Sequence, residues 1–247
     1  MSWGNGPALT LAHGFTQNAG TWGRFGELLG IQHRVRAVDL PGHGGSTGIH
    51  GDLPTSAALL GAADIPSDYL GYSLGGRVAL HLAVAHPERV ARLVLIGSTG
   101  GIDDPALREA RRATDEALAD ELDAGLALDA FLDRWLTQPL FRSLPEEASQ
   151  RDARARNTTA GLAASLRECG TGTQTPLWDQ LASIRRPVLV VAGALDVRFT
   201  VLGRRLVNAL DPHHEGFARL ALVPGAGHAC HLERPELTAR LVNAFLA

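Results

Sequence analysis

The stretch Gly71-Tyr72-Ser73-Leu74-Gly75-Gly76 decides the fold. An apolar run, Tyr69–Tyr72, precedes its serine, and a helix-compatible run, Arg77–Ala85, follows it. A Gly-x-Ser-x-Gly match is weak evidence by itself, but a serine on the turn between a strand and a helix is typical of a nucleophile elbow. Such a turn strains the serine backbone, and only small neighbours leave room for it. We therefore predict that Ser73 is a nucleophile; the alternative is an ordinary glycine-rich turn.

Short apolar runs alternate with helical patterns on both sides of this elbow, which is typical of a parallel α/β sheet. The runs are continuous, as expected for strands that are covered on both faces. Right-handed crossovers then predict a mostly parallel sheet with helices on both faces and with its loops gathered at the C-terminal strand ends. The predicted strands are Ala8–Ala12, Val35–Val38, Tyr69–Tyr72, Leu93–Ile96, Val188–Ala192 and Leu220–Val223, and the predicted helices include Gly75–Ala85 and Leu237–Phe245.

The strand pattern stops between Gly101 and Ile184. Charged segments rich in Ala and Leu occupy this stretch instead, and they predict a helical cap inserted after a strand. We therefore divide the chain into a core of residues 1–100 and 184–247 and a cap of residues 101–183. The weakly patterned stretch Gly48–Ile65 is interpreted as a short helix with loops. The predicted cap helices are Asp104–Leu122, Leu126–Leu136, Glu146–Asn157 and Gly161–Glu168.

A serine hydroxyl needs a base to react near neutral pH, and the base needs a carboxylate that orients it. In enzymes with a nucleophile elbow the chain order is Ser, then acid, then His. Asp196 and His228 each come just after a predicted strand, at the same sheet edge as Ser73, and His228 lies in a Gly-rich turn. We therefore predict a relay of these three side chains. Asp179 and Asp211 remain alternative acids.

An oxyanion hole needs two backbone N–H groups that point at one position. The N–H of Leu74, directly after the nucleophile, is one predicted donor. The other is expected in the loop after an early strand, where His13-Gly14-Phe15-Thr16 follows Ala8–Ala12 and makes Phe15 the second predicted donor.

The composition excludes several classes of protein. With 247 residues, 45% hydrophobic and 20% charged, the chain is predicted to be globular, and its net charge of −3 argues against a nucleic-acid-binding protein. All 23 cationic residues are arginine, so an anion site must use guanidinium or backbone N–H groups. No apolar run reaches the roughly 18 residues of a membrane span, and the N-terminus lacks the pattern of a signal peptide. We expect a cytoplasmic location, no membrane and no cofactor.

No metal site is expected either. Neither Cys169 nor Cys230 lies in a metal-like cysteine pair, and two cysteines are too few for a disulfide framework. The stretch Asp39-Leu40-Pro41-Gly42-His43-Gly44 has a metal-like combination of Asp and His, but its Gly and Pro residues favour a turn after a strand.

Together these motifs resemble the α/β-hydrolase fold. The resemblance covers the predicted core, and it does not specify a reaction, because this fold hosts many chemistries. The residues that carry it are His13-Gly14-Phe15, Asp39-Leu40-Pro41-Gly42-His43-Gly44, the elbow, Asp196 and His228.

Segments of the predicted cap narrow the resemblance to the 2-succinyl-6-hydroxy-2,4-cyclohexadiene-1-carboxylate synthase family of menaquinone biosynthesis. The chain departs from that family in a shorter N-terminus, in a poorly matched stretch Gly48–Ile65 and at Arg198, where the family often has Lys. The similar segments are Trp135-Leu136-Thr137-Gln138-Pro139-Leu140-Phe141, Leu162-Ala163-Ala164-Ser165-Leu166-Arg167, Gly170-Thr171-Gly172, Pro176-Leu177-Trp178, Gly75-Gly76-Arg77 and Asp196-Val197-Arg198-Phe199.

This resemblance implies a carbon–oxygen lyase that eliminates pyruvate from 2-succinyl-5-enolpyruvyl-6-hydroxy-3-cyclohexene-1-carboxylate. A serine oxygen activated by histidine can take a proton as well as attack carbon, and an oxyanion hole can stabilise the resulting enolate. Residues matching Arg77, Arg167 and Trp135 line the family's substrate pocket, so we expect them to bind a small polycarboxylate substrate. Tyr72 either offers its hydroxyl to the substrate or packs. The alternatives are a serine esterase or a carbon–carbon bond hydrolase of the same fold, and a non-catalytic binding protein.

Overall fold

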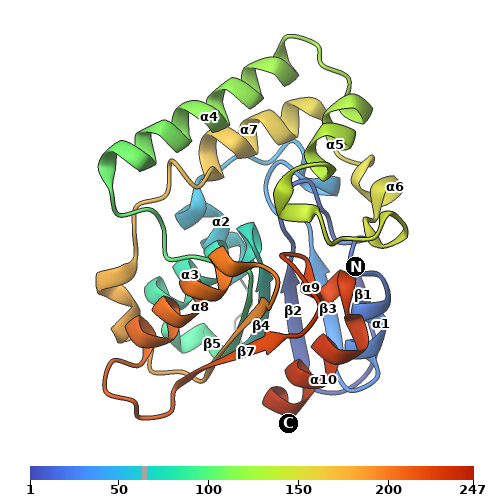
Figure 1. Ribbon diagram of the computed structural model, residues 1–247. Helices are drawn as coiled ribbons and strands as arrows, with labels where there is room; N and C mark the ends of the chain where they lie inside the picture. Colours follow the sequence, from blue (N-terminus) through green and yellow to red (C-terminus); the bar gives the residue numbers. More distant parts are fainter. Residues whose placement is uncertain (63–65) are drawn as a thin grey trace.

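A seven-stranded sheet forms the centre of the computed structural model, which describes residues 1–62 and 66–247 (Figure 1). Its strand order is β1-β3-β2-β4-β5-β6-β7, and neighbouring strands are parallel except for β1 and β3. The predicted α/β class with a mostly parallel sheet is therefore confirmed. The strands are β1 (Ser2–Trp3), β2 (Ala8–Ala12), β3 (Arg34–Val38), β4 (Ser67–Tyr72), β5 (Val90–Ile96), β6 (Val188–Gly193) and β7 (Ala218–Val223).

The apolar runs form strands because the sheet interior buries both of their faces. All residues of β6 are buried, whereas the edge strand β7 leaves most of its residues partly exposed. Each predicted strand is present, and most extend one to three residues beyond the predicted limits. The prediction missed β1, because two residues are too short to show a period.

Helices cover both faces of the sheet, as predicted. Side chains of α2, α3 and α8 join one buried cluster, which includes Leu53, Val78 and Leu206, and side chains of α1 and α10 join another, which includes Phe25 and Val242. The helices are α1 (Gly23–Gly30), α2 (Leu53–Leu60), α3 (Leu74–Ala85), α4 (Pro105–Asp123), α5 (Leu128–Leu136), α6 (Arg151–Arg154), α7 (Thr159–Cys169), α8 (Val197–Leu210), α9 (Cys230–Glu233) and α10 (Pro235–Leu246).

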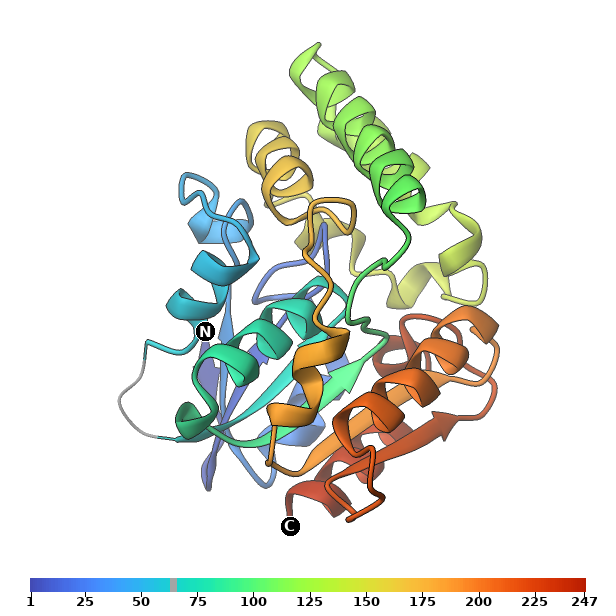
Figure 2. The ribbon, with the colours of Figure 1, turned by 90° about the vertical axis from the view of Figure 1, so that its left-hand side faces the viewer.

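The segment between β5 and β6 contains α4 to α7 and lies above one edge of the sheet in both views (Figures 1 and 2); we call it the cap. The helix α4 begins at Pro105 because the Asp104 carboxylate accepts hydrogen bonds from the first free N–H groups. Helices α4, α5 and α7 share a small apolar cluster of their own, which includes Leu122, Phe131 and Leu162.

The segments 146–157 and 48–65 show how far the helix predictions hold outside the long helices. A single helix over residues 146–157 is wrong: a 3₁₀ turn (Glu146–Ala148) and α6 replace it, because Gln150 between them has a left-handed backbone, with φ 58°. The stretch predicted as a short helix with loops, residues 48–65, contains α2 as its helix, and residues 63–65 of it lie outside the described residues. Among the helices described, none combines the length and the apolar character that crossing a bilayer demands.

Candidate active site

Ser73 occupies the turn from β4 to α3, with φ 51° and ψ −106°. This backbone conformation is rare for a residue other than glycine and costs free energy, so the surrounding structure must hold it. The fit is tight: a Cβ on Gly75 would lie 2.0 Å from the carbonyl oxygen of Ala12 in β2, and a Cβ on Gly71 would lie 2.4 Å from that of Gly75. The strained serine and its small neighbours are therefore present as the elbow motif predicts.

Asp196 and His228 meet at the ends of β6 and β7. The Nδ1–H of His228 donates to Asp196 Oδ2 at 3.0 Å, and the N–H of Phe199 donates to the other carboxylate oxygen at 3.0 Å. Burial of the Asp196 carboxylate works to raise its pKa, but these hydrogen bonds outweigh burial and hold the pKa below its ordinary value. The Asp196 carboxylate thus orients the imidazole through Nδ1, and among the described residues Nε2 has no hydrogen-bond partner.

The alternative acids lie elsewhere. The Asp211 carboxylate accepts the N–H groups of Glu215, Gly216 and Phe217 in the loop before β7, and Asp179 is exposed on a 3₁₀ helix (Trp178–Ser183). Sequence alone left this choice open; among the described residues, Asp196 is the one of the three that is hydrogen-bonded to His228.

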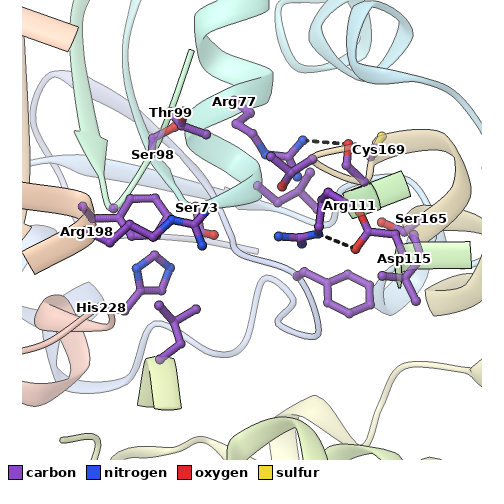
Figure 3. Close-up of a pocket in the computed structure, with 18 of the residues that line it drawn as sticks. Ser73, Arg77, Ser98, Thr99, Arg111, Asp115, Ser165, Cys169, Arg198 and His228 are labelled. Carbon is purple, nitrogen blue, oxygen red and sulfur yellow. Dashed lines mark hydrogen bonds and ion pairs between the residues drawn. The ribbon is translucent and has the colours of Figure 1, made fainter. Parts of the chain in front are cut away.

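Ser73 and His228 line one pocket, on the same side of it in Figure 3. The cavity that they line has a volume of about 110 Å³. Phe15 and Leu74, the predicted oxyanion donors, line it as well. Within the described residues neither of their backbone N–H groups donates to an acceptor, so both are available to a substrate oxygen.

His13 fixes the loop that carries Phe15. Its Nδ1–H donates to Gly14 O at 2.9 Å and its Nε2 accepts from Leu40 N–H at 3.0 Å, which defines the neutral tautomer. Burial lowers the pKa of His13 to about 4. The N–H of Gly14 donates to Gln17 Oε1 at 3.0 Å and completes the loop. His13 is therefore a structural group of the oxyanion loop rather than a second base.

Three arginines line the pocket: Arg77, Arg111 and Arg198. Arg77 is buried and donates to Gly170 O at 3.4 Å, and burial lowers its pKa to about 10, so it stays charged at neutral pH. Arg111 on α4 pairs with the buried Asp115 at 2.8 Å. Figure 3 shows Arg77, Arg111 and Asp115 across the pocket from Arg198 and His228. The pocket is therefore cationic on opposite walls.

The rest of the wall mixes apolar side chains such as Leu140 and Leu166 with polar ones such as Ser98 and Ser165, and it comes partly from the cap. Trp135, predicted as a binding residue, lines the pocket, and its ring lies 4.9 Å from that of Phe15. Arg111 and Arg198 are site residues that the sequence prediction did not assign. Arg198 had a usable signal, because it lies two residues after Asp196, whereas Arg111 is one of many arginines on a charged helix.

Two predicted binding residues lie outside the pocket lining. All three guanidinium nitrogens of Arg167 on α7 are paired with carboxylates of α4, namely Glu116, Asp120 and Asp123, at 2.6–2.7 Å. The prediction that Arg167 clamps the substrate is therefore corrected: it fastens two cap helices. Of the two alternatives for Tyr72, the structure shows packing, because its ring is buried in the core at 4.3 Å from that of His231.

No cluster of His, Cys, Asp and Glu side chains suited to a metal ion occurs in residues 1–62 and 66–247. The pocket lining brings together a serine hydroxyl, a histidine, two backbone N–H donors and three arginines. Among the described residues, no hydrogen bond joins the Ser73 hydroxyl to His228. Such a set can abstract a proton next to a carbonyl or attack an acyl carbon, with the developing oxyanion bound by the same donors.

Comparison with known proteins gives matches that agree on the family and differ in the activity that their names state. The "Alpha/beta hydrolase family" model matches residues 11–241. A Bacillus subtilis protein, provisionally named 2-succinyl-6-hydroxy-2,4-cyclohexadiene-1-carboxylate synthase, is 34% identical over 97% of this chain and 90% of its own. A pimeloyl-[acyl-carrier protein] methyl ester esterase of Xanthomonas campestris is 33% identical over 99% of this chain and 96% of its own. Among solved structures, MenH from S. aureus has a TM-score of 0.88 and 29% identity, covering 97% of this chain and 93% of that chain.

Proposed function

Because the chain belongs to the alpha/beta hydrolase family, we propose that its serine–histidine pair serves a carbon–oxygen lyase of menaquinone biosynthesis. The proposed substrate is 2-succinyl-5-enolpyruvyl-6-hydroxy-3-cyclohexene-1-carboxylate, from which the enzyme eliminates pyruvate. The product is 2-succinyl-6-hydroxy-2,4-cyclohexadiene-1-carboxylate. Relatives that carry the name of this synthase, at 32–34% identity over nearly the whole chain, support the assignment.

The observation that carries the proposal is the gathering of Arg77, Arg111 and Arg198 around the pocket that holds Ser73. A substrate with three carboxylates needs separate cationic partners, and guanidinium groups bind carboxylates through two parallel hydrogen bonds. A simple ester would bring no charge to compensate the buried Arg77, and burying an unpaired cation costs free energy.

The proposed reaction uses each group of the site once. The Ser73 oxygen takes the proton next to the succinyl carbonyl while the Ser73 proton moves to His228 Nε2, and Asp196 stabilises the imidazolium. The carbonyl oxygen becomes an enolate oxygen, which the N–H groups of Phe15 and Leu74 bind. The enolate then re-forms the carbonyl, a double bond forms between C2 and C3, the ring double bond moves from C3–C4 to C4–C5, and the bond from C5 to the enolpyruvyl oxygen breaks. The released enolpyruvate takes up the proton from His228 and becomes pyruvate.

A serine esterase is the second candidate, and one observation favours it. Relatives named pimeloyl-[acyl-carrier protein] methyl ester esterase are as similar to this chain as the synthases are, at 33% identity over 94–99% of it. In that function Ser73 would attack the ester carbon, and the same N–H pair would bind the tetrahedral oxyanion.

The two functions are separated by their products. Purified protein is mixed with the enolpyruvyl substrate, and pyruvate is followed by coupling to lactate dehydrogenase and NADH. We expect pyruvate to appear far faster than it does spontaneously, and Ser73→Ala to lower the rate by about 10⁴-fold or more. Pyruvate release at the spontaneous rate would refute the lyase. A burst of p-nitrophenol from p-nitrophenyl acetate, equal to the enzyme concentration, would then support the esterase.

A further inference from the structure

Residues 149–158 of the cap dock on the core loop that carries one of the predicted oxyanion donors. Two side chains of this stretch, Arg154 and Asn157, reach Thr16, the residue directly after Phe15. Both are buried, with 1% of Arg154 and 4% of Asn157 exposed. Neither lines the pocket, and the proposed reaction uses neither.

Arg154 is a buried cation whose hydrogen bonds go to neutral groups. Its Nε donates to Ser149 O at 2.8 Å and its Nη1 donates to the hydroxyl of Thr16. No ion pair with a carboxylate involves it in the part of the chain that the structure describes. Burying an uncompensated charge costs free energy, and an apolar side chain of similar size would pack there at lower cost. Stabilisation of the cap therefore does not explain why an arginine occupies position 154.

Asn157 bonds to two separate core loops. Its Nδ2 donates to Thr16 O at 2.6 Å, and its Oδ1 accepts from Gly44 N–H at 2.8 Å. The cap thus holds both the backbone oxygen and the side-chain hydroxyl of Thr16.

The backbone conformation of Thr16 needs these contacts. Its φ is 66°, in the left-handed region, which is a real outlier for a β-branched residue. Such a conformation persists only where the surroundings fix it, and it tends to occur at functional sites. Thr16 follows Phe15 directly, so a shift of the Thr16 backbone moves the Cα of Phe15 and with it the preceding peptide group, which carries the Phe15 N–H.

We propose that Arg154 and Asn157 are positioning residues that hold Thr16 in its strained conformation and thereby aim the Phe15 N–H at the oxyanion. The oxyanion hole is then assembled from both parts of the molecule, with the donor on the core and its support on the cap. The inference rests on the proposed role of Phe15, but not on the identity of the substrate. The competing explanation is simple docking of the cap, which Asn18 also serves through its 2.6 Å hydrogen bond to Ala153 O.

Arg154→Met and Thr16→Val each remove the bond to the Thr16 hydroxyl, and Thr16→Ser retains it. Arg151→Met is the matched control, because Arg151 lies on the same helix and, among the residues that the structure describes, its side chain bonds only to Asp129 and Asp133 in the cap. Removing an oxyanion donor costs about 10²–10³-fold in kcat, so we expect a misdirected donor to cost about 10–100-fold. The KM should change by less than about 3-fold, and the serine variant and the control should stay within about 2-fold of wild type.

Hydrogen–deuterium exchange of the peptide that spans residues 13–18 gives a second readout that needs no substrate. Loss of the hold should raise exchange there by about 10-fold while the peptides of β4 and β5 stay unchanged, with thermal unfolding recorded for each variant. Unchanged kcat and unchanged local exchange in Arg154→Met and Thr16→Val would overturn the inference, and so would a raised KM at constant kcat, which indicates docking alone. If wild type releases no pyruvate, the proposed function fails and the exchange measurement still decides the inference.

Discussion

Three buried histidines should make the fold sensitive to mild acid. Burial lowers the pKa of His13 to about 4, that of His43 to about 3 and that of His231 to about 3. In an unfolded chain a histidine has a pKa of about 6.5. Below that pH the unfolded chain therefore binds more protons than the folded one, and the free energy of unfolding falls as the pH falls. The loss continues until the folded form titrates near pH 3–4.

The size of the effect follows from these values. At pH 5 an unfolded histidine is mostly protonated while the buried one stays neutral, which costs about 2 kcal/mol relative to pH 7. Three such residues together cost about 6 kcal/mol. A domain of this kind has a total stability of about 5–15 kcal/mol, so most of the margin could be lost between pH 7 and pH 5.

Urea unfolding followed by circular dichroism at pH 7, 6 and 5 measures this loss. The variant His231→Leu removes one of the three groups, and we expect it to reduce the loss by about 2 kcal/mol. His213→Gln is the control, because His213 is exposed in the loop before β7. Equal free energies of unfolding at pH 7 and pH 5, or an unchanged pH dependence in His231→Leu, would refute the reasoning.

The remaining predictions concern the elbow and the arginines. Gly75→Ala should lower the melting temperature by ten degrees or more, or abolish folding, because the added Cβ would overlap the β2 backbone. Gly48→Ala is the control: its added Cβ lies in open space, so the melting temperature should change little. Arg77→Met should lower kcat/KM for pyruvate release by about 100-fold, since a charge-assisted hydrogen bond contributes about 1.5–3 kcal/mol; a normal kcat/KM would remove it from the binding site. Arg167→Met should leave kcat/KM within about 2-fold, because its guanidinium is held by α4, and a large kinetic defect would contradict its structural assignment.

The elbow and the strands were predictable because their signals are local. A strand that is buried on both faces has a continuous apolar sequence wherever it lies in the fold, and the turn at Ser73 requires small neighbouring residues in any fold. His228 and Asp196 followed from strand order, since parallel strands bring their C-terminal ends to one edge. The choice of Asp196 over its alternatives needed the three-dimensional hydrogen bond.

The arginines of the pocket were not predictable in the same way. Arg111 and Arg167 lie on neighbouring cap helices of similar composition, and which one faces the pocket depends on how each helix is rotated and docked. No periodicity in one helix specifies that rotation. The left-handed backbones of Gln150 and Thr16 were not predictable either, because neither residue type favours that conformation locally.

The core and the cap contribute different residues to the pocket, and this has an evolutionary consequence. The proposed catalytic residues Ser73, Asp196 and His228 follow strands of the sheet, whereas Arg111, Trp135 and their neighbours belong to one uninterrupted piece of chain between β5 and β6. Mutations confined to this one insertion can therefore change which substrate binds, while the proposed catalytic residues on the core stay the same. If the support of Thr16 acts as inferred, each rewritten insertion must still supply two hydrogen bonds at the same place, which sets a limit on which caps can be exchanged.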